Sequence, residues 1–144
     1  ITDTDISKKI KSVNNWDLLI DKTIHIRKII NDQLIHAPKI YPAYSHVMQK
    51  FPNKNWVPAG DTASSFDPIS SMGVGYAILS GIYAAKCAQN QIENKRDSSC
   101  NYMKNIIQNF NQYLKRRYYY YNNEKRWKEK LFWKRRQTKP NFVT

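Results

Sequence analysis

The chain has 144 residues, of which 41% are hydrophobic and 24% charged, so it can bury a core and is too apolar for a disordered polymer. No apolar run approaches the roughly 20 residues that a membrane-spanning helix needs, which excludes a membrane protein of the helical kind. The two cysteines, Cys87 and Cys100, lack metal-site spacing, and His25 and His46 lie singly. We therefore expect no metal site, reduced thiols in a cytoplasmic protein, and Cys87 as a small core residue.

Residues 1–55 are predicted to hold the end of a substrate-side sheet and connecting helices. Residues 1–6 have the pattern of a strand end that leads into a helix, with aspartates as candidate caps. Isoleucines at helical spacing predict one or two helices between residues 16 and 30. Apolar and polar residues alternate at 39–46, and Pro42 excludes a helix interior, so an edge strand is expected there.

The segment 56–90 carries the most information, because all four glycines of the chain fall in it. It predicts a short buried strand, Trp56–Asp61, followed by a turn at Asp67-Pro68. In open α/β sheets, ligands bind beyond the carboxyl ends of the strands. Asp61 is therefore placed to meet a ligand hydroxyl, and Gly60 removes the side chain that would block the approach.

A helix is predicted from near Met72 to near Asn90, with Ser70 and Ser71 as candidate caps. Its N-terminus offers unpaired N–H groups and a partial positive charge, which favour an anionic ligand edge. Small residues recur at spacings of three or four and predict close backbone packing; they are Gly73, Ala77, Gly81, Ala84 and Ala88. The full order of strand, Gly-Asp, Asp-Pro turn and helix favours a flavin site over a capped core helix without a ligand.

Residues 91–137 are predicted to form a C-terminal helical segment, and residues 138–144 a tail. A polar joint leads to an apolar stripe that begins at Tyr102 and predicts a long helix running through the tyrosines at 118–121.

Ten basic residues lie between Lys115 and Arg136, interleaved with tyrosines and tryptophans. Such a mixture can bind single-stranded nucleic acid through phosphate contacts and base stacking. A solvated helix that packs its aromatic residues inward is the favoured interpretation, since no nucleic-acid-binding motif accompanies the charge.

The run GDTASSFDPISSMGVGYAILSGIYAA resembles the signature GDAA…DPLSSxG…A…SG…AA of flavin-dependent monooxygenases of the p-hydroxybenzoate hydroxylase fold. The branch that it resembles most is the tryptophan-halogenase-like group, which includes the maturation flavoproteins that hydroxylate protein tryptophans during quinone-cofactor formation. The flanking runs ITDTDI, TIHIRKII and YLKRRYYYYNNEKRWKEKLFWKRR are also similar to family segments, so the resemblance covers nearly the whole chain.

The resemblance implies a set of FAD contacts. Asp61 would accept hydrogen bonds from the ribityl or pyrophosphate region, with Gly60 allowing the approach. Pro68 would lie against the isoalloxazine ring, its position fixed by Asp67. Backbone N–H groups would face the pyrimidine edge from the residues at the helix start, which are Met72, Gly73 and Val74. Met72 departs from the family pattern, in which a polar residue such as Gln is common. No catalytic residue is assigned.

The expected fold is an α/β fragment, predominantly helical: the distal part of an FAD-binding α/β domain with a few strands and two long C-terminal helices. A G-x-G-x-x-G turn, which such flavoproteins need for the pyrophosphate, is absent from the sequence. We therefore expect a C-terminal fragment or split-gene product that requires a missing N-terminal dinucleotide-binding portion and is inactive by itself.

The expected function is that of an FAD-dependent oxidoreductase segment, monooxygenase or halogenase-like, whose substrate is aromatic, with a protein tryptophan as one candidate. The alternative is a non-catalytic basic helical module that binds nucleic acid or an acidic partner protein. Nucleic acid is the less favoured of these partners, and no membrane contact is expected.

Overall fold

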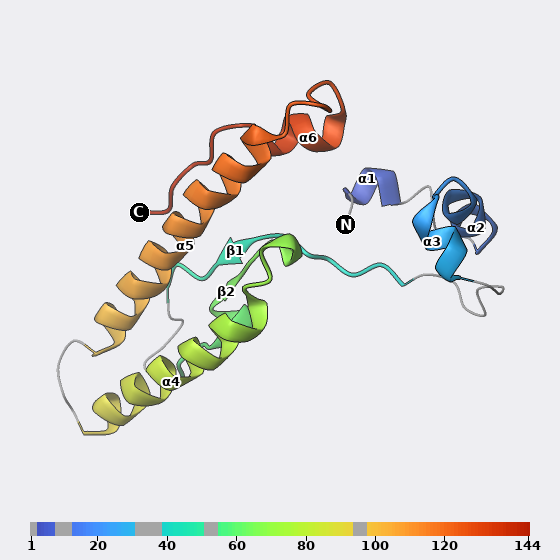
Figure 1. Cartoon of the computed structure of the whole chain (residues 1–144). Coiled ribbons are helices and arrows are strands. Elements are labelled where there is room, and N and C mark those ends of the chain that lie inside the picture. The colour runs from blue at the N-terminus through green and yellow to red at the C-terminus, as the bar shows by residue number, and fades with distance from the viewer. Residues whose placement is uncertain (1–2, 8–12, 31–38, 51–54, 94–97) are drawn as a thin grey trace. The chain divides into compact units, whose positions relative to one another are not determined.

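The computed structural model describes residues 3–7, 13–30, 39–50, 55–93 and 98–144, and these ranges are mostly helical (Figure 1). The chain divides into two units, Ile1–Pro42 and Ala43–Thr144. Within the described ranges, no helix combines the length and the apolar character that crossing a membrane requires.

The first unit holds three short helices, α1 (Thr4–Ser7), α2 (Val13–Asp21) and α3 (His25–Ile29). One or two helices were predicted between residues 16 and 30, and the structure has two, of which α2 begins earlier, at Val13. Thr23 Oγ1 donates to the carbonyl of Ile20 at 2.7 Å, which ends α2, and Arg27 pairs with Asp21 at 3.1 Å. The helix that residues 1–6 were predicted to lead into is confirmed, but it begins already at Thr4, directly after Asp3, so no strand extends to residue 6. Ile1 and Thr2 lie outside the described residues.

The second unit contains a two-stranded antiparallel sheet. Strand β1 (His46–Val47) pairs with β2 (Ser64–Ser65), with His46 opposite Ser65. The edge strand predicted at 39–46 is therefore reduced to its last residue. Pro42 has no N–H to give to a neighbouring strand, and the Tyr44 carbonyl accepts from the Ser65 side chain at 2.7 Å.

The strand predicted at Trp56–Asp61 is wrong, because the described residues 56–59 have no regular structure and η2 (Gly60–Thr62) is a 3₁₀ turn. Side chains from the helices take the place of a neighbouring strand. Tyr102 Oη donates to the Pro58 carbonyl at 2.8 Å, and Ser80 Oγ accepts from the Gly60 N–H at 2.8 Å. Pro58 itself has no N–H for a ladder.

The two predicted long helices are present as α4 (Gly73–Ile92) and α5 (Ser98–Asn123). They pack on one another and contribute most of the core. The first core cluster joins both helices; its buried members are Ala63, Ala84, Cys87, Tyr102 and Ile106. Cys87 is 3% exposed, which confirms it as a core residue.

The second core cluster is aromatic and comprises Phe66, Phe110 and Tyr113. The Phe66 ring meets the Tyr113 ring edge to face at 4.8 Å, and the Phe110 and Tyr113 centroids are 5.7 Å apart. Such pairs add about 0.5–1.5 kcal/mol each beyond the area they bury. This cluster anchors the chain that precedes Asp67.

The C-terminal segment folds back on α5. Helix α6 (Leu131–Arg136) is followed by Gln137, whose Nε2 donates to the carbonyls of Tyr121 and Glu124 at 3.0 and 2.7 Å. These bonds satisfy carbonyls at the end of α5 that have no partner within the helix. Within the predicted tail 138–144, the backbone of Val143 exchanges two hydrogen bonds with the Asn111 side chain, at 2.7 and 2.9 Å.

Alkaline pH is expected to unfold this second unit through two buried tyrosines. Burial raises the pKa of Tyr102 and of Tyr121 from 10.0 to about 12 in the folded chain, and the Asp67 carboxylate adds to the effect on Tyr121. Because the folded pKa is the higher one, this stability is complete below pH 10 and is lost as the pH rises toward 12. Tyrosinate absorbance and far-ultraviolet circular dichroism, followed together, should show late ionisation coincident with loss of helix. The variant Tyr102→Phe removes one of the two hydroxyls, so it should lose less helix over the same rise in pH. Full tyrosine ionisation with intact helicity would contradict the expectation.

Candidate functional site

The Gly60 backbone adopts the left-handed conformation and lies close to α4. Its φ is 57°, and a Cβ at this position would lie 3.5 Å from the Ala77 Cβ. Ser80, which is 3% exposed, receives the Gly60 N–H and donates in turn to the Ala77 carbonyl at 3.2 Å. The small residues of this part of α4 thus let η2 approach, and the next side chain, Asp61, is exposed.

The substitution Gly60→Ala is expected to destabilise the chain by about 1–2 kcal/mol, the cost of a left-handed conformation for a residue with a Cβ. Gly81→Ala is the matched control, because Gly81 is interior to α4 and, among the described residues, nothing lies within 4 Å of its Cβ position. The control should stabilise by about 0.5–1 kcal/mol. Urea unfolding measures both, and equal effects would show that the Gly60 conformation is unstrained.

The Asp67-Pro68 turn is confirmed as a tight turn. Asp67 caps the 3₁₀ helix η3 (Pro68–Ser70): Oδ1 accepts from the Ile69 N–H at 3.2 Å, and the Asp67 carbonyl accepts from the Ser70 N–H at 2.9 Å. Ser71 follows with a φ of 53°. Asp67 is only 7% exposed, whereas Pro68 and Ile69 are exposed. The turn therefore has a buried base and an accessible tip.

Three α5 residues hold Asp67, and the sequence analysis did not identify them. Tyr113 Oη accepts from the Asp67 N–H at 2.8 Å, Tyr121 Oη donates to Oδ2 at 2.7 Å, and Arg117 Nε lies 3.5 Å from that oxygen. We call Tyr113, Arg117 and Tyr121 the α5 clamp. Burial raises the pKa of Tyr113, and the hydrogen bond to Ser45 partly offsets this by lowering it. The four-residue spacing of the clamp was the signal available in the sequence, since such residues share a helix face.

Helix α4 begins directly after this turn. The Tyr76 N–H bonds to the Met72 carbonyl, so the amides of Gly73, Val74 and Gly75 belong to the first turn, which has no preceding carbonyls to accept them. Met72 is the N-cap residue and has no side-chain cap bond, so the prediction that Ser70 or Ser71 caps α4 is wrong. Ser70 Oγ instead accepts from the Met72 N–H, at 3.4 Å. The Met72 side chain packs against the aromatic cluster. The apolar residue that replaces the polar one of the family pattern therefore serves the core.

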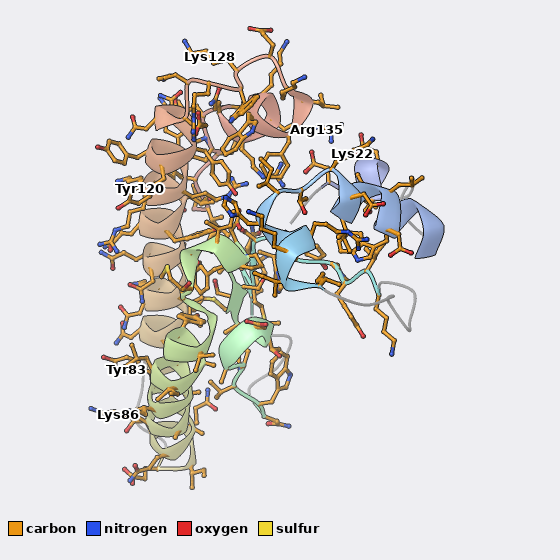
Figure 2. The ribbon with its side chains drawn as sticks, turned by 45° about the vertical axis from the view of Figure 1, so that its right-hand side comes forward. Lys22, Tyr83, Lys86, Tyr120, Lys128 and Arg135 are labelled. Atoms are coloured by element: carbon orange, nitrogen blue, oxygen red, sulfur yellow. The ribbon has the colours of Figure 1, made fainter. Side chains whose placement is uncertain are left out.

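The outer face of α4 is apolar and exposed. Its exposed large side chains are Val74, Ile78, Leu79, Ile82 and Tyr83. Figure 2 shows Tyr83 and Lys86 projecting outward from this helix. The predicted close packing of the small residues holds at Ala77 and Ala84 but fails at Gly73 and Gly81, near whose Cβ positions nothing lies within 4 Å among the described residues.

The predicted site residues fall into two adjacent groups. Asp67, Pro68, Met72, Gly73 and Val74 form the turn and the first turn of α4, while Gly60 and Asp61 lie against α4 at Ala77, about one helical turn further on. An exposed carboxylate, an exposed proline and bare helix amides thus gather along one end of α4. Such a set can accept hydrogen bonds from hydroxyls and donate them to a carbonyl or an anionic heterocycle.

The basic and aromatic residues between 115 and 136 divide between interior and surface. Inward, the Tyr121 ring meets the Trp133 ring at 5.7 Å, and Arg136 lies 3.7 Å over the Phe132 ring. Outward, Tyr119 and Tyr120 are 62% and 71% exposed. The predicted inward packing of aromatic residues is therefore correct for part of the segment.

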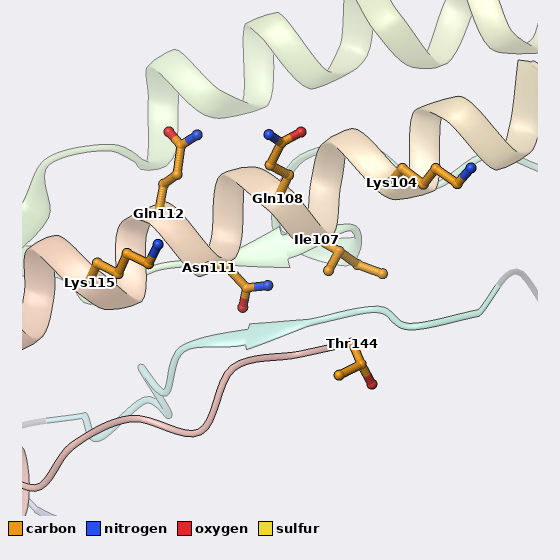
Figure 3. A pocket seen from close by; sticks show the side chains of 7 residues that line it. All are labelled: Lys104, Ile107, Gln108, Asn111, Gln112, Lys115 and Thr144. Carbon is orange, nitrogen blue, oxygen red and sulfur yellow. The ribbon is translucent and has the colours of Figure 1, made fainter.

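A shallow groove of about 350 Å³ lies between α5 and the C-terminal segment (Figure 3). Two lysines and three amide side chains line it, together with Ile107 and Thr144; these are Lys104, Lys115, Gln108, Asn111 and Gln112. None of these lining residues belongs to the predicted site. In the described ranges, His, Cys, Asp and Glu side chains form no group of three that could bind a metal ion.

No protein-family model and no solved structure matches this chain. The chain is similar to a protein of Marinomonas mediterranea named "Putative FAD-dependent oxidoreductase LodB", with 27% identity over 140 residues. The aligned region is 94% of this chain and 37% of the relative. Along nearly its whole length, this chain is therefore similar to little more than a third of a protein named as an oxidoreductase.

Proposed function

We propose that this chain is the distal segment of an FAD-dependent oxidoreductase and supplies part of its flavin site. The observation that carries the proposal is the arrangement at the start of α4, where Asp61, Pro68 and the first helical turn are all accessible around a buried base. The 27% identity to the Marinomonas relative supports it independently.

The residues present fit a flavin. Asp61 would accept hydrogen bonds from the ribityl hydroxyls, and Gly60 keeps the chain close to α4 there. Pro68 would lie against the ring, and the amides of Met72, Gly73 and Val74 would face its pyrimidine edge. Among the described residues, nothing lies within 4 Å of the Cβ position of Gly73 or Gly75, so the backbone of this turn is open to a ligand. The positive end of α4 favours an anionic ring edge.

The bound flavin would supply the redox chemistry, and this chain's own residues would bind it, orient it and fix charge near it. We propose an aromatic substrate, such as a tryptophan side chain of another protein, and a reaction of the monooxygenase or halogenase-like class. We also retain the cytoplasm as the proposed location.

A dinucleotide-binding portion would cover the exposed face of α4. An apolar face of this kind is unusual on a free protein surface and marks an interaction site. Val74 is 78% exposed, Ile78 62% and Ile82 61%. The match to only 37% of the relative leaves most of that protein's length to provide such a portion. The coding sequence adjoining this chain is the first observation to make, since an in-frame strand, G-x-G-x-x-G and helix would supply it.

The substitution Asp61→Ala, made in the complete flavoprotein, is expected to lower FAD occupancy about tenfold while the fold survives, since the side chain is exposed. Flavin absorbance per protein and circular dichroism measure the two quantities. Asp21→Ala, another exposed aspartate, is the control. Full flavin occupancy in the Asp61 variant would argue against the assignment.

A basic helical module that binds an acidic partner or nucleic acid is the alternative proposal, and exposed Tyr119 and Tyr120 favour it. It predicts binding that weakens steeply with salt. It leaves the arrangement at the start of α4 without a role, and we therefore rank it second.

A further inference from the structure

We propose that the α5 clamp positions the Asp67-Pro68 turn for the flavin, so that the C-terminal half of α5 sets cofactor affinity without touching the cofactor. This inference rests on the proposed function. It agrees with the role that the resemblance implies for Asp67, which is to fix the position of Pro68, and it adds the α5 residues that hold Asp67.

Asp67 is fully engaged within the chain. Its N–H goes to Tyr113, its Oδ1 accepts from Ile69, its Oδ2 accepts from Tyr121, and its carbonyl accepts from Ser70. Asp67 is only 7% exposed, and both of its carboxylate oxygens already accept hydrogen bonds within the chain, so it is poorly placed to contact a ligand directly. Asp67 is therefore a positioning residue, and Pro68 at the accessible tip is the residue that meets the ring.

The clamp fixes the middle of the turn, between the ends that Phe66 and Met72 hold on the aromatic cluster. Between β2 and α4 the chain makes only the short η3 turn, and Ser71 takes a left-handed conformation that a serine rarely adopts. A buried carboxylate is costly unless it is paired and hydrogen-bonded. Arg117 and Tyr121 meet that need in one geometry, and this geometry fixes where Pro68 and the first amides of α4 point.

The C-terminal aromatic residues extend this control. Tyr121 is held by the Trp133 ring at 5.7 Å and, through its carbonyl, by Gln137 at 3.0 Å. The Arg117 guanidinium lies 5.1 Å from the Tyr121 ring centre, so the two clamp residues also hold one another. The tyrosine- and tryptophan-rich end thereby acts on the site through Tyr121.

The test compares Tyr121→Phe with Tyr120→Phe, each of which removes one hydroxyl; Tyr120 is 71% exposed and serves as the matched control. Arg117→Lys keeps the charge and Arg117→Met removes it. Hydrogen exchange at the Ile69 and Ser70 amides of the full chain reports on the turn. FAD affinity and the flavin absorbance spectrum, measured with the dinucleotide-binding portion present, report on the site.

Tyr121→Phe should speed exchange at both amides and raise the Kd for FAD, each by about tenfold. Arg117→Met should do the same, Arg117→Lys should recover most of the affinity, and Tyr120→Phe should change neither quantity. Unchanged exchange in Tyr121→Phe would overturn the clamp and leave the flavin assignment standing. Faster exchange with unaltered FAD affinity would overturn the inference in the same way. A wild-type protein that binds no FAD would overturn both proposals.

Discussion

Asp67→Ala is expected to destabilise the chain by about 3 kcal/mol, near the lower end of the cost of breaking a buried ion pair because the Arg117 side chain remains 26% exposed. The variant leaves the guanidinium without its paired carboxylate and the Tyr121 hydroxyl without its acceptor, and it removes the cap of η3. Urea unfolding followed by tryptophan fluorescence, with the linear extrapolation to water, measures the change.

Two further variants separate charge from hydrogen bonding. Asp67→Asn keeps an oxygen for the Ile69 amide and an acceptor or donor beside Tyr121, so it should cost about half as much. Asp67→Ala combined with Arg117→Met removes the unpaired cation and should recover at least about 1 kcal/mol relative to Asp67→Ala. Purely additive effects would mean that Asp67 and Arg117 do not interact.

The parts of the fold that were predictable are those that local patterns determine. Helix α5 was predictable because its apolar residues recur at helical spacing. The turn at Asp67-Pro68 was predictable because both residues restrict the backbone locally. Cys87 was recognised as a core residue from its apolar neighbours on α4.

The predictions that failed depended on a neighbour elsewhere in the chain. A strand requires a pairing partner, and at Trp56–Asp61 the Tyr102 and Ser80 side chains supply the bonds instead. The α5 clamp joins residues 46 to 54 positions apart in the sequence, which no local pattern encodes. On α4, the spacing of small residues predicted close packing. It holds at Ala77 and Ala84, whereas nothing among the described residues lies within 4 Å of the Cβ positions of Gly73 and Gly81.

Phe110→Ala is expected to destabilise the chain by about 3–5 kcal/mol, the usual cost of emptying a buried phenylalanine site. Phe110 is 5% exposed and belongs to the cluster that contains Phe66 and Tyr113. Phe142→Ala is the control, because Phe142 is 44% exposed and its contact to Lys115, at 5.5 Å, is worth about 0.5–1 kcal/mol. Equal losses of unfolding free energy in the two variants would show that the aromatic cluster does not contribute to the stability of the core.

Phe110 also connects stability to the candidate site. The cluster holds Phe66 immediately before Asp67, and the Met72 side chain packs on it immediately before α4. Both ends of the turn are therefore fixed from the same set of rings, while the α5 clamp fixes its middle. Phe110→Ala should loosen the ends of the turn only in proportion to the lost stability, whereas Tyr121→Phe should loosen its middle by more than its loss of unfolding free energy accounts for. Hydrogen exchange at Ile69, compared with the unfolding free energy of each variant, distinguishes a turn that is clamped locally from one that merely follows the core.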